Sequence, residues 1–437
     1  EIRLSLVGSE MCIRDRPTRI RLTTVAGQPR YILEYPGPRK VAVDSHSGQP
    51  AAPPDRVEAL AAARQFAPEA VARDRGVVQE DMWSLSRALD ADRPLHRVAI
   101  ADAERRLLYI SGTTGEVVRD ATASERGWNW IGAWLHWLYP LRGIGIDGAW
   151  GPIVTYLSLA ATLMAVLGLA VGVLRWRFKR TYRNGSHSPY QGFARWHHLG
   201  GMLFGVLLIT WIFSGLMSMN PWKLFSSAQP LSVAAYQGGP LGALAFPLNA
   251  GQVLQRFADD GLQARELEWR MIAGKGYVIG YDGAGRTRIF DMAGDRVQRR
   301  FHPGTLQQAA WAIRPGQPML VEQLAAYDFY YYAREPQSMM GHLQQRLPVL
   351  RVRFDDPAHT WLHLDLHTGA IVGQLDQPRR ASRWLFALLH SWDWLPLLAN
   401  RPLWDLWMIA FSAGGLLVSA SGVVLGWRRL GRSLQRR

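Results

Sequence analysis

The chain has 437 residues, 48% of them hydrophobic, and a formal net charge of +15. That length suits two or three domains. The charge does not indicate a nucleic-acid partner, because the strongest basic clusters directly follow apolar stretches, where Lys and Arg mark the cytoplasmic ends of membrane helices. These clusters are Arg175, Arg177, Lys179, Arg180 and Arg183, and Arg428, Arg429, Arg432, Arg436 and Arg437.

Residues 1–16 have the composition of a foreign peptide. The run Ser5–Arg16 resembles translated sequencing-adaptor read-through, and it is too short and too charged for a signal peptide or a membrane anchor. We expect this peptide to be non-native and to take no part in the fold. Cys12, the only cysteine, lies in it, so neither a disulfide nor a thiolate metal site is expected.

Two segments, residues 17–127 and 220–381, are predicted to be small α+β domains. Each contains short strands that end in a polar residue and a glycine, which is typical of hairpin turns with a positive φ. Amphipathic helices are predicted at Val57–Phe66, after the start signal Pro53-Pro54-Asp55, and at Ala250–Ala258. The predicted hairpins are Lys40–Gly48, Leu107–Gly115, Arg288–Gly294 and Thr360–Gly369.

Three apolar stretches are long enough to span a bilayer, which takes about 20 helical residues. They are Pro152–Leu174, Phe193–Met219 and Leu403–Trp427. The basic segments 175–192 and 428–437, which follow the first and third stretches, are predicted to be cytoplasmic. Both α+β segments would then lie on the opposite side, which is the periplasm if the lipid bilayer is the inner (cytoplasmic) membrane of a Gram-negative bacterium.

One part of the chain recurs 254 residues later. The repeat predicts two copies of one unit, each with an α+β domain, an interfacial segment (128–151 and 382–402) and a membrane helix (152–174 and 403–427). Two such copies imply a pseudo-twofold axis along the membrane normal. The second copy opens with the helix 193–219. The first copy has no such helix, so we expect the intact protein to carry a fourth, N-terminal span. The matched residues are Leu108, Thr114, Gly115, Arg126, Trp130, Ala133, Leu135, His136, Trp150, Ser158, Leu163, Gly168, Gly172 and Arg175 with Leu362, Thr368, Gly369, Arg380, Trp384, Ala387, Leu389, His390, Trp404, Ser412, Leu417, Gly422, Gly426 and Arg429.

Several of these segments resemble the PepSY-associated transmembrane family. The strand–Thr-Gly hairpins look like PepSY domains, and Arg195–Met219 looks like the family's membrane helix. Leu389-His390 with its following helix, Tyr327–Arg334 and Leu347–Asp356 add to the resemblance, which covers nearly all of the chain from residue 17 onward. It implies a membrane protein related to haem-containing reductases of siderophore-iron uptake, although many members have no known role. In the family the first helix usually carries a further histidine near the cytoplasmic face, and that helix is absent here.

His136 and His390 occupy equivalent positions on the periplasmic side of their helices. Two imidazoles make a low-spin electron-transfer haem, and facing helices commonly build such sites. The sequence therefore predicts an outer haem b held by His136 and His390. The alternative is that each is an interfacial histidine hydrogen-bonded to a carbonyl group or water.

His197 and His198 open the second membrane helix at its cytoplasmic end. Adjacent helical residues point about 100° apart, so one face presents only one of them. His197 shares its face with Gly201, where a small residue leaves room for a flat macrocycle, and it matches the leading histidine of the family motif. We predict His197 as a ligand of a second, inner haem, with His198 as the second choice and a partner ligand on the absent helix. The alternative is a cationic interfacial pair.

His359, His363 and His367 would form one face of a helix, but Asp356-Pro357 and the Thr-Gly turn predict a strand and hairpin. His363, Asp365 and His367 would then share a strand face, which favours an ordinary solvated strand over a metal site. Packing is the expected role of Tyr330, Tyr331 and Tyr332. Arg351 and Arg353 are expected on a solvated face, although they could attract an anionic siderophore.

The predicted function is electron transfer across the membrane to a periplasmic acceptor, with ferric siderophore or another iron chelate as the acceptor that the resemblance implies. The cytoplasmic segments are too short for a flavin or nicotinamide domain, which takes on the order of 100 residues. The electron donor would therefore be a quinol or a separate cytoplasmic reductase. The alternative is a non-enzymatic membrane protein whose PepSY-like domains bind or regulate a periplasmic protease or other protein. The sequence assigns no catalytic residue.

Overall fold

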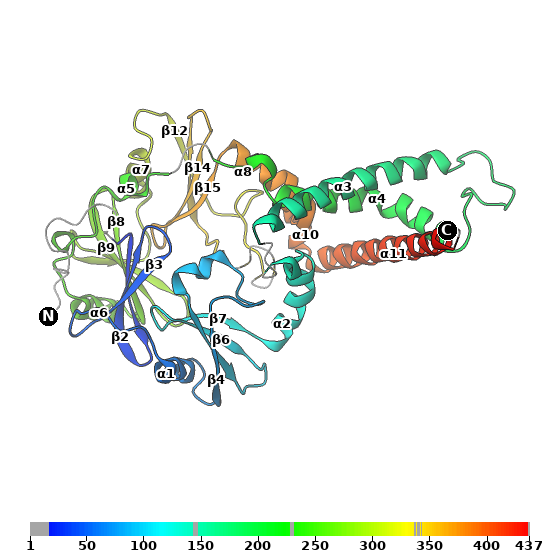
Figure 1. Ribbon diagram of the computed structural model, residues 1–437. Helices are drawn as coiled ribbons and strands as arrows, with labels where there is room; N and C mark the ends of the chain where they lie inside the picture. Colours follow the sequence, from blue (N-terminus) through cyan, green and yellow to red (C-terminus); the bar gives the residue numbers. More distant parts are fainter. Residues whose placement is uncertain are drawn as a thin grey trace. The chain divides into compact units, whose positions relative to one another are not determined.

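A computed structural model describes residues 17–142, 147–227, 231–335, 338, 341 and 343–435. The peptide 1–16 with Cys12, and Arg436 and Arg437, lie outside the described residues. The chain divides into two units, which we call the sheet unit and the helical unit (Figure 1). The sheet unit comprises Glu1–Pro140, Gln229–Ala325 and Arg346–Gln374, and the helical unit comprises Leu141–Ala228, Ala326–Gln345 and Leu375–Arg437.

Antiparallel sheets form the framework of the sheet unit (Figure 1). The largest has the order β11 (Arg296–Gln298), β10 (Thr287–Asp291), β9 (Lys275–Tyr281), β8 (Glu266–Ile272), β1 (Arg19–Val25), β2 (Gln28–Tyr35) and β3 (Arg39–Asp44). A second sheet contains β4 (Ala72–Val78), β5 (Leu95–Ile100), β6 (Leu107–Ser111) and β7 (Val117–Ala121). A third contains β12 (Met319–Leu324), β13 (Val349–Phe354), β14 (Trp361–Asp365) and β15 (Ile371–Leu375).

The largest sheet joins two segments that are far apart in the chain. β1 pairs with β8, with Ile20 opposite Trp269, so β1–β3 belong to the same sheet as β8–β11. The sequence pattern predicts separate domains at 17–127 and 220–381, whereas β1–β3 and β8–β11 form one sheet. α3 and α4, described below, lie between these strands in the chain and are both long and apolar enough to cross a membrane, and two such crossings would return the chain to the side from which it started.

A buried carboxylate stabilises the β1–β8 junction. Glu268 is 2% exposed and accepts hydrogen bonds from Arg19 Nη2 and the Tyr281 hydroxyl, both at 3.0 Å, and it pairs with Arg270. Burial alone would raise the pKa of Glu268. The charge of Arg270 and the charge and hydrogen bond of Arg19 outweigh the burial and hold that pKa at about 2.

Short helices cover the sheets and begin where the sequence predicts. α1 (Arg56–Phe66) starts after Asp55, whose side chain accepts from the Glu58 amide. α6 (Ala250–Asp259) starts with a reciprocal capping box between Asn249 and Gln252. Both predicted helices are therefore confirmed. The remaining helices of the sheet unit are η2 (Arg87–Asp92), α2 (Ala123–Asn129), η3 (Trp130–Leu135), α5 (Val233–Gln237), η6 (Ala243–Ala245) and α7 (Pro303–Trp311), and η4 (Tyr139–Leu141) ends at the boundary.

The predicted hairpin turns form, and three of their glycines have the expected positive φ. Gly48, Gly115 and Gly369 have φ of 70°, 78° and 68°. In the fourth turn the prediction of Gly294 was wrong by one position. There Asp295 takes the left-handed conformation with φ of 44°, while the Gly294 amide donates to the Asp291 side chain.

The second and third sheets contain strands at matched positions in the chain. β5 spans 95–100 and β13 spans 349–354, β6 spans 107–111 and β14 spans 361–365, and β7 spans 117–121 and β15 spans 371–375. The bounds of each pair differ by the 254 residues seen in the sequence. Helices follow the same spacing, since α3 and α11 begin at Asp147 and Arg401.

Three helices of the helical unit are long and apolar enough to cross a membrane: α3 (Asp147–Arg175), α4 (Gly192–Ser218) and α11 (Arg401–Leu434). The three predicted helices are therefore confirmed, and they fit a multi-pass membrane protein. α4 packs against both α3 and α11. The contact with α11 is close, because a Cβ added at Gly414 would lie 2.4 Å from the Phe204 ring. The other helices of this unit are η5 (Pro221–Lys223), α8 (Gln377–Ser382), η7 (Arg383–Leu388), α9 (Leu389–Ser391) and α10 (Leu395–Ala399).

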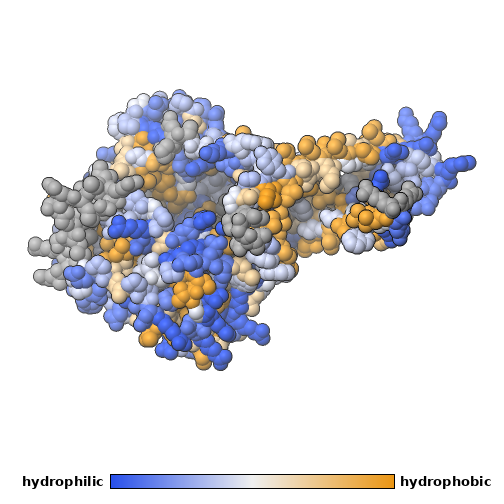
Figure 2. Space-filling view, viewed as in Figure 1, coloured by the Kyte–Doolittle hydropathy of each residue, from blue (hydrophilic) through white to orange (hydrophobic). Residues whose placement is uncertain are grey.

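The surface of these long helices suits a lipid environment. Figure 2 shows mainly hydrophobic residues over α3, α4 and α11, and hydrophilic residues at the end where the loop 176–191 joins α3 to α4. Exposed side chains on these helices include Leu167, Leu203 and Leu416. In water such a surface would be unfavourable, whereas lipid tails match it.

Candidate functional site

His197 lies near the start of α4 and faces α11. Its Nδ1 donates to the Val418 carbonyl oxygen and the Ser421 hydroxyl oxygen, both at 3.1 Å. Both oxygens accept this bond, because the Ser421 hydroxyl donates its own proton to the carbonyls of Leu417 and Val418. A neutral His197 therefore carries its lone pair on Nε2, the atom that would bind a metal.

There is open space beside His197 on the same helix face. A Cβ added at Gly201 would meet nothing within 4 Å, although a Cβ at Gly422 would come within 3.2 Å of the His197 ring. Gly201 lies one turn after His197 and shares its face. A lone pair held on Nε2 next to a vacant face fits the predicted ligand role.

His198 has a different environment, although it is the next residue. It is 7% exposed, its Nδ1 lies 2.7 Å from the Ser188 hydroxyl, and its Nε2 lies 2.8 Å from the Gly172 carbonyl oxygen. The carbonyl requires Nε2 to donate, so Nδ1 accepts from Ser188. Both ring nitrogens are engaged, and His198 connects α3, α4 and the loop between them. This geometry favours His197 over His198 as the residue that could hold an iron.

His390 lies in α9, directly after the π-helix η7, and is half-buried. Its Nδ1 is 3.0 Å from the hydroxyl oxygen of Ser214 on α4. That hydroxyl donates its proton to the Trp211 carbonyl at 2.9 Å, so Nδ1 of His390 donates to it. A neutral His390 thus has the same tautomer as His197, with the lone pair on Nε2.

His136 is exposed and directly follows the π-helix η3 in the sheet unit. π-helices are rare and are frequently found at functional sites. Two of them occur among the described residues: η3 ends at Leu135, directly before His136, and η7 ends at Leu388, directly before Leu389-His390. His136 and His390 belong to different units, so their pairing around one haem stays a prediction.

His197 and Ser214, the partner of His390, lie at opposite ends of α4. The 17 residues between them correspond to about 25 Å along a helix axis, close to the roughly 30 Å thickness of a bilayer core. The two histidines with the same tautomer are therefore near opposite faces of the membrane-spanning region.

A buried charged cluster lies next to the His390 segment in the chain. Asp393 is 1% exposed and binds Arg383 Nη1 at 2.8 Å, Arg334 Nη1 at 3.0 Å and the Tyr332 hydroxyl at 2.5 Å. Sequence reasoning missed Asp393. The available signal was an acidic residue within the otherwise apolar stretch after His390, where an acid needs a buried partner.

The three histidines near residue 360 do not form a metal site. β14 ends at Asp365, so His367 lies in the following turn and not on the strand face predicted for it, and His359 lies in the preceding turn with φ of 47°. His363 is 1% exposed and its Nε2 accepts from Arg351 Nε at 2.8 Å. No group of three or more potential metal ligands occurs among the described residues.

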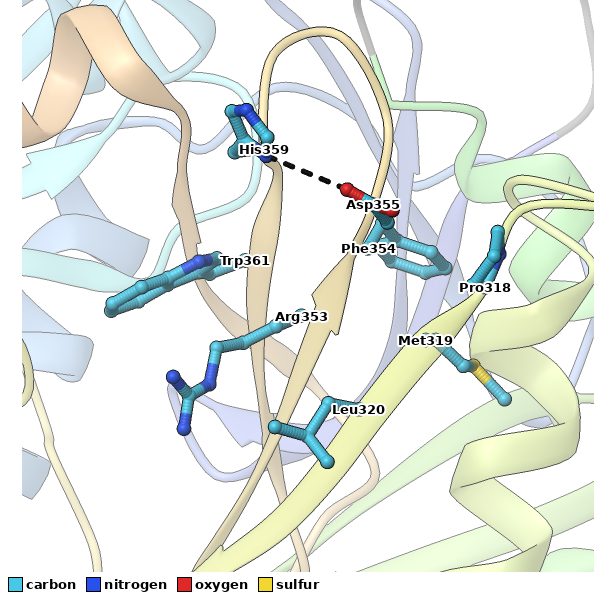
Figure 3. A pocket seen from close by; sticks show the side chains of 8 residues that line it. All are labelled: Pro318, Met319, Leu320, Arg353, Phe354, Asp355, His359 and Trp361. Atoms are coloured by element: carbon cyan, nitrogen blue, oxygen red, sulfur yellow. Dashed lines mark ion pairs between the residues drawn. The ribbon is translucent and has the colours of Figure 1, made fainter.

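The two arginines of β13 also differ from the expected solvated face. Arg351 is only 4% exposed, while Arg353 is about one-third exposed, and Glu322 pairs with both. Leu320, Arg353 and Trp361 stand opposite one another on adjacent strands. They line an open pocket of about 410 Å³, closed at one end by the ion pair of Asp355 and His359 (Figure 3).

Packing was expected of the three tyrosines, and Tyr331 is buried, whereas Tyr330 and Tyr332 are half-buried and form side-chain hydrogen bonds. Tyr331 is 1% exposed, Tyr330 accepts from the Trp384 indole at 3.1 Å, and Tyr332 donates to Asp393.

No known family model matches the chain, and no curated protein matches it either. The resemblance to the PepSY-associated family therefore stays a prediction.

Proposed function

We propose that the protein is a haem-binding electron-transfer protein of the bacterial inner membrane that passes electrons to a periplasmic acceptor. Haem b would supply reversible one-electron transfer. The observation that carries the proposal is the matched setting of His197 and His390. His197 donates from Nδ1 to the Val418 carbonyl oxygen, and His390 has the same tautomer when the Ser214 hydroxyl donates to the Trp211 carbonyl. Nε2 then keeps the lone pair, as in histidines that bind metals.

The residues present fit a haem at each of these positions. His197 has a vacant face at Gly201 on its own helix, and Gly215 next to Ser214 would also admit a Cβ without contact. Buried indole N–H groups of Trp211 and Trp392 have no hydrogen-bond partner among the described residues. Buried polar groups normally have partners, so both indoles have donor capacity for a bound polar group. We infer that His390 holds the outer haem, for which the sequence predicts His136 as the second ligand, and that His197 holds the inner one.

The architecture supports electron transfer from one side to the other. The strands β5–β7 and β13–β15 recur with the same 254-residue spacing as the Leu-His pairs, which supports a duplicated unit. β1 pairs with β8 across two membrane spans, so both domains lie on one side. We infer from the basic residues after α3 and α11 that this side is the periplasm.

The acceptor would be a ferric siderophore or another iron chelate that docks on the periplasmic domains. One electron from the membrane converts its Fe(III) to Fe(II), and the softer ion is held less tightly by hard oxygen ligands. The electron donor would be a quinol in the bilayer or a separate cytoplasmic reductase, because the loop 176–191 is too short to hold a cofactor domain. Electron transfer to such an acceptor requires no reaction with oxygen at the outer haem.

A reduced-minus-oxidised absorption spectrum of the purified chain in detergent tests the proposal. We expect a low-spin haem spectrum that His390→Ala removes or strongly diminishes. His197→Ala should abolish any second component, and His198→Ala should lower thermal stability without removing a ligand. His46→Ala, in an exposed turn of the sheet unit, is the control. If the purified chain shows no low-spin haem after loading, the proposal is wrong, and the partner-binding function becomes the better one.

A further inference from the structure

One ion pair joins the two ends of the segment that carries His390. Arg383 is the first residue of η7, and Asp393 lies two residues after the end of α9. Arg383 Nη1 donates to Asp393 Oδ1 at 2.8 Å, and Arg383 Nη2 donates to the Asp393 carbonyl oxygen at 3.3 Å. The side chain and the backbone of Asp393 are therefore both tied to the start of the segment. We call Asp393, Arg383, Arg334 and Tyr332 the Asp393 cluster.

Other bonds hold the turn at the end of the segment. Trp392 has φ of 50°, a left-handed conformation that a bulky residue rarely adopts and that the surroundings must enforce. The Trp404 indole N–H of α11 lies 3.1 Å from the carbonyl oxygens of both Ser391 and Trp392. The strained turn between His390 and Asp393 is thus fixed from two directions, by α11 and by the Asp393 cluster.

The Asp393 cluster is buried and has an excess positive charge. Arg383, Arg334 and Asp393 have side chains that are 8%, 6% and 1% exposed, so two cations surround one anion. The ring of Phe329 lies 4.1 Å from the Arg383 guanidinium, and its carbonyl accepts from Arg383 Nε at 2.9 Å. Such a buried pair adds little net stability over apolar packing, which leaves room for a role in specifying geometry.

The repeat provides an internal comparison. The positions equivalent to Arg383 and Asp393 in the first copy are Asn129 and Tyr139, which cannot form an ion pair. Even so, the first copy forms its π-helix, and Leu138 adopts the same left-handed turn with φ of 54°. The local fold therefore does not require the cluster. The cluster belongs to the second copy, where Arg383 and Asp393 flank the segment that carries His390.

We propose that Asp393 is a positioning residue, which fixes the orientation of His390 and, with its two arginines, keeps a net positive charge beside the outer redox centre. This inference rests on the proposed haem function. Asp393 acts through the backbone of the segment 383–393, not by contact with a cofactor. Because the cluster is net positive, it favours the reduced form of a nearby centre, which carries one positive charge fewer.

The test compares Asp393→Asn with Asp405→Asn in the full chain, purified in detergent. Asp405 pairs with Arg401 in the same unit at 3.0 Å but is 44% exposed, so it is a matched charge change outside the cluster. We expect Asp393→Asn to weaken haem binding about ten-fold, the usual scale for the loss of a group that orients a ligand. The midpoint potential of the haem in this variant should rise, because the loss of the Asp393 charge makes the cluster more positive. The g-values of its low-spin electron paramagnetic resonance signal should change. Asp405→Asn should match the wild type in all three measurements.

A second variant covers the case in which Asp393→Asn does not fold. Tyr332→Phe removes one hydrogen bond to Asp393 and keeps all three charges. It should alter the g-values while leaving the potential close to that of the wild type. The positioning role would be overturned if a folded Asp393→Asn protein had unchanged haem binding, midpoint potential and g-values. It would also be overturned if the g-values of Tyr332→Phe were unchanged. Either result would leave the haem function intact. A wild-type chain that binds no haem would instead overturn the proposed function itself.

Discussion

Replacing Glu268 with glutamine should weaken the junction between β1 and β8. The pKa of this carboxyl falls from its ordinary value of 4.5 to about 2 in the folded protein, and one pKa unit corresponds to about 1.4 kcal/mol. The ionised carboxylate therefore contributes about 3 kcal/mol to the free energy of unfolding at neutral pH. A domain of this size loses about 2–4 °C of Tm for each kcal/mol. We expect Glu268→Gln to lower the Tm of the sheet unit by about 6–12 °C.

Thermal unfolding followed by tryptophan fluorescence in detergent measures this change. Glu104→Gln is the control, because Glu104 is 52% exposed and pairs only with Arg106 at the surface, where ion pairs contribute about 0–1 kcal/mol. The folded pKa of Glu268 is depressed, so its contribution is complete above pH 4.5 and disappears as the pH falls towards 2. The Tm gap between wild type and Glu268→Gln should narrow over that range. A gap no larger than that of the control, or one that does not depend on pH, would refute the reasoning.

Two further substitutions, one in each unit, test a helix contact and a buried hydrogen bond. Gly414→Ala should lower the Tm, because the new Cβ would lie 2.4 Å from the Phe204 ring and disturb the contact of α4 with α11. The control Gly431→Ala, where a Cβ meets nothing, should leave the Tm unchanged or slightly higher. Equal Tm values for the two variants would argue against close packing at Gly414. Tyr109→Phe should cost about 1–2 kcal/mol, because the buried Tyr109 hydroxyl donates to both oxygens of Asp81 at 3.0 and 2.9 Å, and chemical denaturation would contradict this if the midpoint did not move.

Local features of the fold followed from the sequence because their causes are local. The membrane spans were recognised by length and apolar composition, and α1 and α6 by the caps Asp55 and Asn249. The turn at Gly294 was placed one residue early, because Asp as well as Gly tolerates the left-handed region. In each of these cases a few neighbouring residues decide the conformation.

The pairing of β1 with β8 had no such local cause. The ion pairs that join these strands link residues 245 and 249 apart, such as Arg21 with Glu266 and Arg19 with Glu268. An alternating strand pattern indicates which face is buried but not which strand lies alongside. The repeat itself pointed towards two separate domains and hid the shared sheet.

The candidate site was predicted only as far as residue types and spacing allow. The sequence favoured His197 over His198 through the helix face shared with Gly201. Their different partners could not be foreseen, since Val418 and Ser421 come from α11 and Ser188 comes from a loop. The Asp393 cluster likewise gathers residues from two distant segments of the chain, 332–334 and 383–393. Such long-range contacts decide the tautomers and the charge balance, and they become visible only in the fold.

The central position of β1 in its sheet has a consequence for biosynthesis. β1 is translated about 245 residues before the part of β8 that it meets, which is roughly 10–50 s at typical elongation rates of 5–20 residues per second. During that interval the hairpin of β1 and β2 presents an unpaired strand edge, while two membrane helices are still being made and inserted. Unpaired edges are templates for mispairing. The edge of β1 would therefore need protection until β8 is made, and the synthesis of α3 and α4 sets the earliest time at which the sheet can close.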